Sequence, residues 1–128
     1  MPVLQIQWFE PPGHIAIGDV LAAVNQNVAA ALGCDPASVW STWTTIEPGC
    51  YAEGDDAADG PRDATHPPIV RLLAFEGREG AAIESALIAA AHTLAAQLGI
   101  DPDAPFVVYD EIASGWVFTG GSVRRKPG

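Results

Sequence analysis

The residue with the clearest chemical potential is Pro2, which follows the first methionine of this 128-residue chain. We expect the methionine to be removed, because the proline side chain is small, leaving a secondary amine at the N-terminus. Burial and nearby cations disfavour the charged form of such an amine and lower its pKa. A neutral amine at about pH 7 can take a proton from carbon beside a carbonyl and return it elsewhere. It can also attack a carbonyl as a nucleophile.

Two arginines are candidates for binding an anion near such an amine. Arg78 lies in the segment Phe75-Glu76-Gly77-Arg78, where a strand is expected to pass into a helix. A guanidinium at a strand end can bind a carboxylate through two hydrogen bonds. Arg71 stands within an apolar strand and therefore has two interpretations. It either pairs with an acid across a subunit interface or lines a pocket.

A further group of candidates lies near the end of the chain. Tyr109 offers a phenol, and the acids that follow it, Asp110 and Glu111, should point to opposite faces of a strand. Trp116 and Phe118 offer an apolar wall, although packing in the core or an interface is an equally natural use for them.

The charge distribution narrows the range of partners. The net charge is −10, which argues against nucleic acid and anionic membranes as partners. Residues 1–61 contain no lysine or arginine, so the first half cannot supply a cation to an anionic ligand. The two cysteines and three histidines have no metal-like spacing, and we expect free thiols and no metal site. No signal peptide or membrane span is apparent, which favours a cytoplasmic protein.

The chain contains an internal duplication that fixes its organisation. Residues 2–55 align with residues 68–121 at a constant offset of 66, without a gap. The Leu-Gly-x-Asp-Pro motif occurs in both copies, at residues 32–36 and 98–102. We therefore expect one domain over residues 1–128, with repeat one at 2–55, a linker at 56–67, repeat two at 68–121 and a basic tail at 122–128. The linker is rich in turn formers and is expected to be mobile.

Hydrophobic periodicity predicts the same elements in both copies. Apolar residues alternate with polar ones in the first strand segment, and they recur at helical spacing in the two helical segments. Residues 39–46 are rich in the strand-forming residues Trp and Thr. The expected strands are 3–9, 39–46, 69–75 and 106–112, and the expected helices are 15–32 and 78–98. Residues 116–118 are expected to form a short return strand. This order predicts an α+β fold in which two βαβ repeats form a four-stranded mixed sheet with two helices on one face. A ferredoxin-like fold has the same order of elements and stays open at this point.

The motifs together resemble those of the tautomerase superfamily, which includes 4-oxalocrotonate tautomerase and macrophage migration inhibitory factor. The opening Pro2-Val3-Leu4-Gln5-Ile6 is similar to the catalytic start of these enzymes. The segment Phe75-Glu76-Gly77-Arg78 is similar to their substrate-binding Glu-Gly-Arg segment. Residues 111–121, which end in a double glycine, are similar to their closing segment, and residues 100–109 are similar to the inhibitory-factor branch. The resemblance covers nearly the whole chain outside the linker and favours this fold over the ferredoxin-like one.

The resemblance implies a homotrimer with sheets facing inward and a cofactor-independent reaction. Pro2 would act as general base and then acid on a small anionic keto or enol acid, and Arg78 would bind the substrate, with Arg71 and Tyr109 as further binding candidates. The apolar wall near Trp116 and Val117 would lower the local dielectric. Pro68, the repeat partner of Pro2, lies inside the chain and has no basic nitrogen, so each subunit should carry one active site.

The chain also departs from the family pattern. Glu10-Pro11-Pro12 replaces Glu76-Gly77-Arg78 in the first repeat, so the first arginine is absent, and Val117 stands where the short tautomerases have an aromatic residue. The paired arginines of malonate semialdehyde decarboxylase and the full residue set of the cis-3-chloroacrylic acid dehalogenases are also missing. Tautomerisation, decarboxylation and hydration therefore stay open. The alternative function is a non-catalytic trimeric binding module of the same fold.

Overall fold

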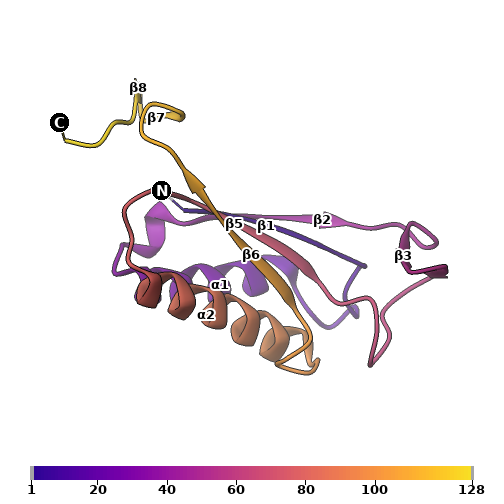
Figure 1. The fold of residues 1–128 in the computed structure, drawn as a ribbon. Coiled ribbons are helices and arrows are strands. Elements are labelled where there is room, and N and C mark those ends of the chain that lie inside the picture. Colours follow the sequence, from indigo (N-terminus) through magenta and orange to yellow (C-terminus); the bar gives the residue numbers. More distant parts are fainter. Residues whose placement is uncertain (1, 128) are drawn as a thin grey trace.

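The computed structural model describes residues 2–127 and shows one sheet, two helices and two small hairpins (Figure 1). The helices are α1 (Ile17–Leu32) and α2 (Gly80–Leu98), with a single 3-10 turn, η1 (Pro36–Ser38). The strands are β1 (Val3–Trp8), β2 (Trp40–Thr45), β3 (Tyr51–Glu53), β4 (Asp56–Ala58), β5 (Ile69–Phe75), β6 (Phe106–Ile112), β7 (Phe118–Thr119) and β8 (Ser122–Val123).

The main sheet has the order β2-β1-β5-β6. The strands within each repeat are parallel, and β1 and β5 run antiparallel at the centre. Both helices cover one face of this sheet (Figure 1). The expected α+β fold of two βαβ repeats is confirmed, and so is the mixed four-stranded sheet.

Alternation along the two central strands builds the core. Leu4, Ile6 and Trp8 are buried, whereas the intervening Gln5 and Gln7 are exposed. The same alternation in β5 buries Val70, Leu72 and Ala74 and exposes Arg71. Since successive side chains of a strand point to opposite faces, the buried set meets the helices and Gln5 and Arg71 lie on the open face.

The duplication continues in the structure beyond the range that the sequence indicated. The hairpin of β3 and β4 and the hairpin of β7 and β8 have the same register at the offset of 66. Asn27 of α1 donates a hydrogen bond to Thr93 of α2 at 2.8 Å, and these two positions are also equivalent. Each repeat is therefore a βαβ unit followed by a small hairpin. The second hairpin projects from the body (Figure 1).

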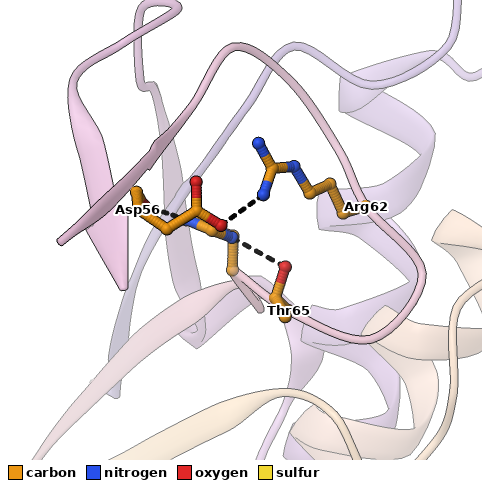
Figure 2. A network of polar contacts seen from close by, with 4 residues as sticks. Asp56, Arg62 and Thr65 are labelled. Atoms are coloured by element: carbon orange, nitrogen blue, oxygen red, sulfur yellow. Dashed lines mark hydrogen bonds and ion pairs between the residues drawn. The ribbon is translucent and has the colours of Figure 1, made fainter. Parts of the chain in front are cut away.

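The linker is more structured than its composition suggested. Residues 56–58 form β4, and the side chain of His66 is completely buried. The His66 ring bonds through Nδ1 to Thr65 Oγ1 at 2.8 Å and through Nε2 to the backbone oxygen of Asp56 at 2.7 Å. Figure 2 shows this network, in which Arg62 also pairs with the Asp56 carboxylate. Part of the segment that was expected to be a mobile linker therefore has regular structure, and the buried His66 contacts both hairpin residues and the core.

Helix α2 is long and apolar enough to cross a membrane by length and composition alone. Its apolar residues nevertheless have partners within the domain, since Ala86, Ala90, Leu94 and Leu98 are buried in the core. This buried face packs against α1 and β6, whereas Ile88 of the same helix is 47% exposed.

Candidate active site

The structure places Pro2 and Arg78 at the same end of the sheet. Val3 pairs with Leu73 across the antiparallel centre, so the start of β1 lies beside the end of β5. Pro2 immediately precedes this pair, and Arg78 follows Leu73 by five residues. The side chain of Pro2 is fully buried, and its carbonyl accepts a hydrogen bond from the Trp40 amide at 3.0 Å. The backbone of the candidate base is therefore fixed by β2.

The Arg78 side chain is held only weakly within the chain. It is partly buried, and its guanidinium donates one long hydrogen bond of 3.4 Å to the carbonyl of Phe75. Within residues 2–127 no carboxylate forms an ion pair with Arg78. A guanidinium with most of its donors available can bind an anion that approaches the end of β5.

Glu76, two residues before Arg78, connects three parts of the chain. One carboxylate oxygen pairs with Nζ of Lys126, and the other accepts a hydrogen bond from the Ser114 amide at 2.7 Å. The Lys126 amide donates in turn to Oγ of Ser114 at 2.7 Å. The hydrogen bond from Lys126, followed by that from Ser114, lowers the pKa of Glu76 below its ordinary value. The C-terminal segment is thus tied to the turn that carries Arg78.

Arg71 does not join Pro2 in this chain. It lies on the open face of the sheet, opposite Gln5, and its guanidinium pairs with Asp110 of β6. The sequence left two interpretations of Arg71, and the structure shows an acid partner, but one from the same chain. Pro2 is three residues from Gln5 along β1, which corresponds to about 10 Å at the rise of a strand.

The remaining candidates lie in two other places. Tyr109 faces the helices, opposite Leu72, and its hydroxyl is buried without a hydrogen-bond partner in the described part of the chain. Trp116 is 82% exposed at the base of the projecting hairpin. Val117 is partly buried, and its carbonyl accepts a hydrogen bond from the Arg124 amide at 2.9 Å. One chain therefore brings Pro2 and Arg78 to one end of the sheet, while Trp116 lies on the projecting hairpin.

Two other features of the described residues bear on a possible site, the potential metal ligands and a separate cavity. Within residues 2–127 no three His, Cys, Asp or Glu side chains gather closely enough to hold a metal ion. A cavity of about 320 Å³ lies at the opposite end of the sheet, beside Pro68 and below the segment from Arg62 to Pro67. Its lining includes Pro67 and Pro68, whose nitrogens are amides and cannot act as bases, and the charged side chains of Glu53, Arg62, Asp63, Asp101 and Asp103.

The contacts among Glu76, Ser114 and Lys126 were not expected from the sequence. A comparison of the repeats contains the signal, because position 48, the equivalent of Ser114, is a proline without an amide hydrogen. Position 60, the equivalent of Lys126, is a glycine. The first repeat cannot make these contacts, and it also lacks the arginine.

No protein-family model and no curated protein sequence matches the chain. Several solved structures share its fold. One is a protein inactivated by 2-oxo-3-pentynoate, with a TM-score of 0.83, 16% identity and coverage of 95% of this chain and 94% of that one. Another is native fused 4-OT, with a TM-score of 0.81, 19% identity and 94% coverage of both chains.

A third similar structure is malonate semialdehyde decarboxylase, with a TM-score of 0.70, 19% identity and coverage of 94% of this chain and 93% of that one. All three similarities extend over almost the full length of both chains, and the identities are low, so they describe the fold rather than the reaction. These proteins are members of the tautomerase superfamily. The chain has the fold of the tautomerase superfamily, as its motifs indicated.

Proposed function

We propose that the protein is a cofactor-independent tautomerase-like enzyme that uses Pro2 as general base and then acid on a small enol or keto acid. The observation that carries this proposal is the position of Pro2. Its side chain is fully buried at the start of β1, beside the end of β5 from which Arg78 follows. The neighbours with this fold include enzymes, among them a decarboxylase.

In the proposed reaction the nitrogen of Pro2 is the N-terminal amine of the mature chain. As a neutral amine it accepts the hydroxyl proton of the enol, and the electron pair moves into a new carbonyl bond. The resulting cationic amine then donates the same proton to a carbon of the substrate, so the proton is conserved. Arg78 binds the substrate carboxylate and stabilises the charge on the enolate oxygen.

The apolar wall is proposed to come from a neighbouring copy. Trp116 and Val117 belong to the hairpin that projects from the body (Figure 1), and Trp116 is largely exposed. Fused 4-OT is described as a trimer. A homotrimer of this chain, placed in the cytoplasm, would allow one copy's hairpin to cover another copy's Pro2 and to lower the dielectric there. Whether Arg71 and Tyr109 bind substrate depends on the same assembly.

Kinetics of Pro2→Ala test the function. The substrates are phenylenolpyruvate and 2-hydroxymuconate, and the measured quantity is the rate of ketonisation. Loss of the general base should lower kcat by roughly 10² to 10⁴-fold without changing the assembly. Pro68→Ala is the matched control, since Pro68 is the buried repeat equivalent of Pro2 and should leave kcat within about twofold of the original. Equal turnover by Pro2→Ala and the parent would end the proposal.

The alternative is a binding module of the same fold without turnover. The observation that favours it is the ion pair between Arg71 and Asp110. Of the two arginines in residues 69–78, this pair leaves only Arg78 without an acid partner in the described residues and so available to bind a substrate. The mass of the intact protein distinguishes the two functions. A chain that has lost the mass of methionine permits the chemistry, whereas retained methionine makes the Pro2 nitrogen an amide and favours the module.

A further inference from the structure

The duplicated architecture of this chain provides an internal comparison for the segment around Arg78. Both repeats have a glutamate just beyond the first strand, Glu10 two residues after the end of β1 and Glu76 directly after β5. Glu10 is exposed and has no hydrogen bond or ion pair of its side chain within the described residues. Glu76 has three polar contacts that join the β5–α2 turn to the rest of the second repeat. The arginine occurs only beside the glutamate that is held.

The contacts of Glu76 form a closed set. The Glu76 amide donates to the carbonyl of Ile112 at 2.9 Å, and its carboxylate accepts from the Ser114 amide at 2.7 Å. The carboxylate also pairs with Lys126, whose own amide donates to Oγ of Ser114 at 2.7 Å. The turn after β5, the turn after β6 and the C-terminal segment thus restrain one another.

The next residue places this set directly beside the arginine. Gly77 has a φ of +109°, in the region that favours glycine, and its Cα faces the side chain of Lys126, since a Cβ added there would lie 3.9 Å from Cε of the lysine. The lysine stem therefore lies next to the residue between Glu76 and Arg78. The Arg78 side chain has one long hydrogen bond of 3.4 Å in the described residues, so its position depends on the turn that carries it.

We propose that Glu76 is a positioning residue for Arg78, and that the C-terminal segment 124–127 is a strap that holds the turn before Arg78 through the ion pair of Lys126 with Glu76. This inference rests on the proposed function in so far as Arg78 binds the substrate. The carboxylate of Glu76 neutralises Lys126 and anchors the strap, and the strap fixes the turn at Gly77. The guanidinium of Arg78 then stays directed to the end of the sheet where Pro2 lies.

The test uses the full chain with Glu76→Gln and Lys126→Gln, and with Glu10→Gln as the matched control. Lys126→Arg, which retains the ion pair, is the conservative variant. Hydrogen exchange of the segment 113–127 is measured first, because it reports the strap without any turnover. Exchange should rise in Glu76→Gln and Lys126→Gln and stay at the parent rate in Glu10→Gln and Lys126→Arg.

Kinetics then separate positioning from a purely structural role. With phenylenolpyruvate, Glu76→Gln should raise KM by roughly three- to tenfold with kcat within about twofold, since the loss falls on substrate binding. With the methyl ester of phenylenolpyruvate, which offers no carboxylate to Arg78, KM should be unchanged. Lys126→Gln should repeat this pattern, and Lys126→Arg should restore the parent KM.

Two results would overturn the inference. Unchanged exchange of residues 113–127 in Glu76→Gln would show that the carboxylate does not hold the strap. Raised exchange with the parent KM for both substrates would show that the strap does not position Arg78. If the parent protein itself has no Pro2-dependent turnover, the proposed function fails, and equilibrium binding of phenylpyruvate to the parent, Glu76→Gln and Arg78→Ala replaces KM in judging Arg78. Equal binding by all three would then reject the positioning role.

Discussion

At the scale of single residues, two prolines in equivalent positions have different proposed roles. Pro2 and Pro68 are both buried, and each carbonyl accepts a 3.0 Å hydrogen bond from the first residue of the neighbouring parallel strand. Only the nitrogen of Pro2 can become a free amine, because Pro68 is acylated by Pro67. The backbone geometry is therefore shared, and the difference in chemistry comes from the position of the chain end alone.

Arg71 and Arg78 should contribute differently to substrate binding. Arg78→Ala is expected to raise KM for phenylenolpyruvate by about 10- to 100-fold, since a hydrogen bond to a charged group is worth roughly 1.5–3 kcal/mol. Arg71→Ala should change KM much less, because the guanidinium of Arg71 already pairs with Asp110. Steady-state kinetics of both variants check this order. A larger effect at Arg71 would mean that the assembly breaks its ion pair and directs it to the substrate.

His66 should contribute strongly to stability. Its ring is completely buried and bonds through both nitrogens, and Nε2 must donate because the Asp56 carbonyl can only accept. His66→Ala leaves that carbonyl unpaired and creates a cavity, which together should lower the free energy of unfolding by about 2–4 kcal/mol. His92→Ala, on the exposed face of α2, should change it by less than about 0.5 kcal/mol. Urea unfolding measures both, and equal effects would contradict the buried role.

At the scale of elements, the two hairpins show how one local structure is used twice. The β3–β4 hairpin is closed onto the body by Tyr51, which stacks on Phe9 and contacts the edge of His66. The β7–β8 hairpin has Val117 at the position equivalent to Tyr51 and projects from the body, with Phe118 70% exposed. The same register therefore gives an internal support in one repeat and an unpartnered arm in the other.

The turn between β5 and α2 depends on its glycine. Gly77→Ala forces a side chain into a φ of +109° and should lower the free energy of unfolding by roughly 1–3 kcal/mol. Gly18, within α1, has an ordinary helical backbone and open space around its Cα. Gly18→Ala should therefore raise stability by about 0.5–1 kcal/mol. Thermal or urea unfolding of the pair checks the opposite signs, and a stabilised Gly77→Ala would contradict the geometry of the turn.

The strap should respond to pH through Glu76. The contacts with Lys126 and Ser114 lower the pKa of this carboxyl from its ordinary value of 4.5. A group whose pKa is depressed on folding stabilises the folded state above its unfolded pKa, and this contribution is lost as the pH falls through the folded pKa. The stability difference between the parent and Glu76→Gln should therefore be present at about pH 7 and be lost as the pH falls through the folded pKa, which lies below 4.5. A difference that grows on acidification would contradict this assignment.

At the scale of the whole molecule, the sequence predicted the architecture well because the duplication and the alternation of apolar residues describe local and repeated features. The strands at 69–75 and 106–112 coincide with β5 and β6. The sequence did not predict β4 or the burial of His66. A single histidine in a polar segment gives no periodic pattern from which its burial could be inferred. The contacts of Glu76 with Ser114 and Lys126 span 38 and 50 residues, and only the fold brings such separated positions together.

The proposed homotrimer also depends on the surface of the whole molecule. The open face of the sheet and the projecting hairpin expose large apolar residues, namely Trp40, Phe106, Val108, Trp116, Phe118 and Val123. Burial of this surface favours association, and sedimentation equilibrium should give a mass of about three chains. Trp116→Lys should shift the equilibrium toward smaller species, whereas Ile88→Lys, on the outer face of α2, should not. A monomeric parent protein would reject the homotrimer.

The central claim is that Pro2 carries the reactive amine, and covalent labelling tests it most directly. The parent protein is treated with 3-bromopyruvate at about pH 7, where a lysine or an ordinary amine is mostly protonated, and the modified peptide is identified by mass spectrometry. The account predicts one label per chain on the nitrogen of Pro2, slower labelling when phenylpyruvate competes, and none on Pro2→Ala at position 2. A label confined to Cys34 or Cys50, or a mature chain that still begins with methionine, would contradict it.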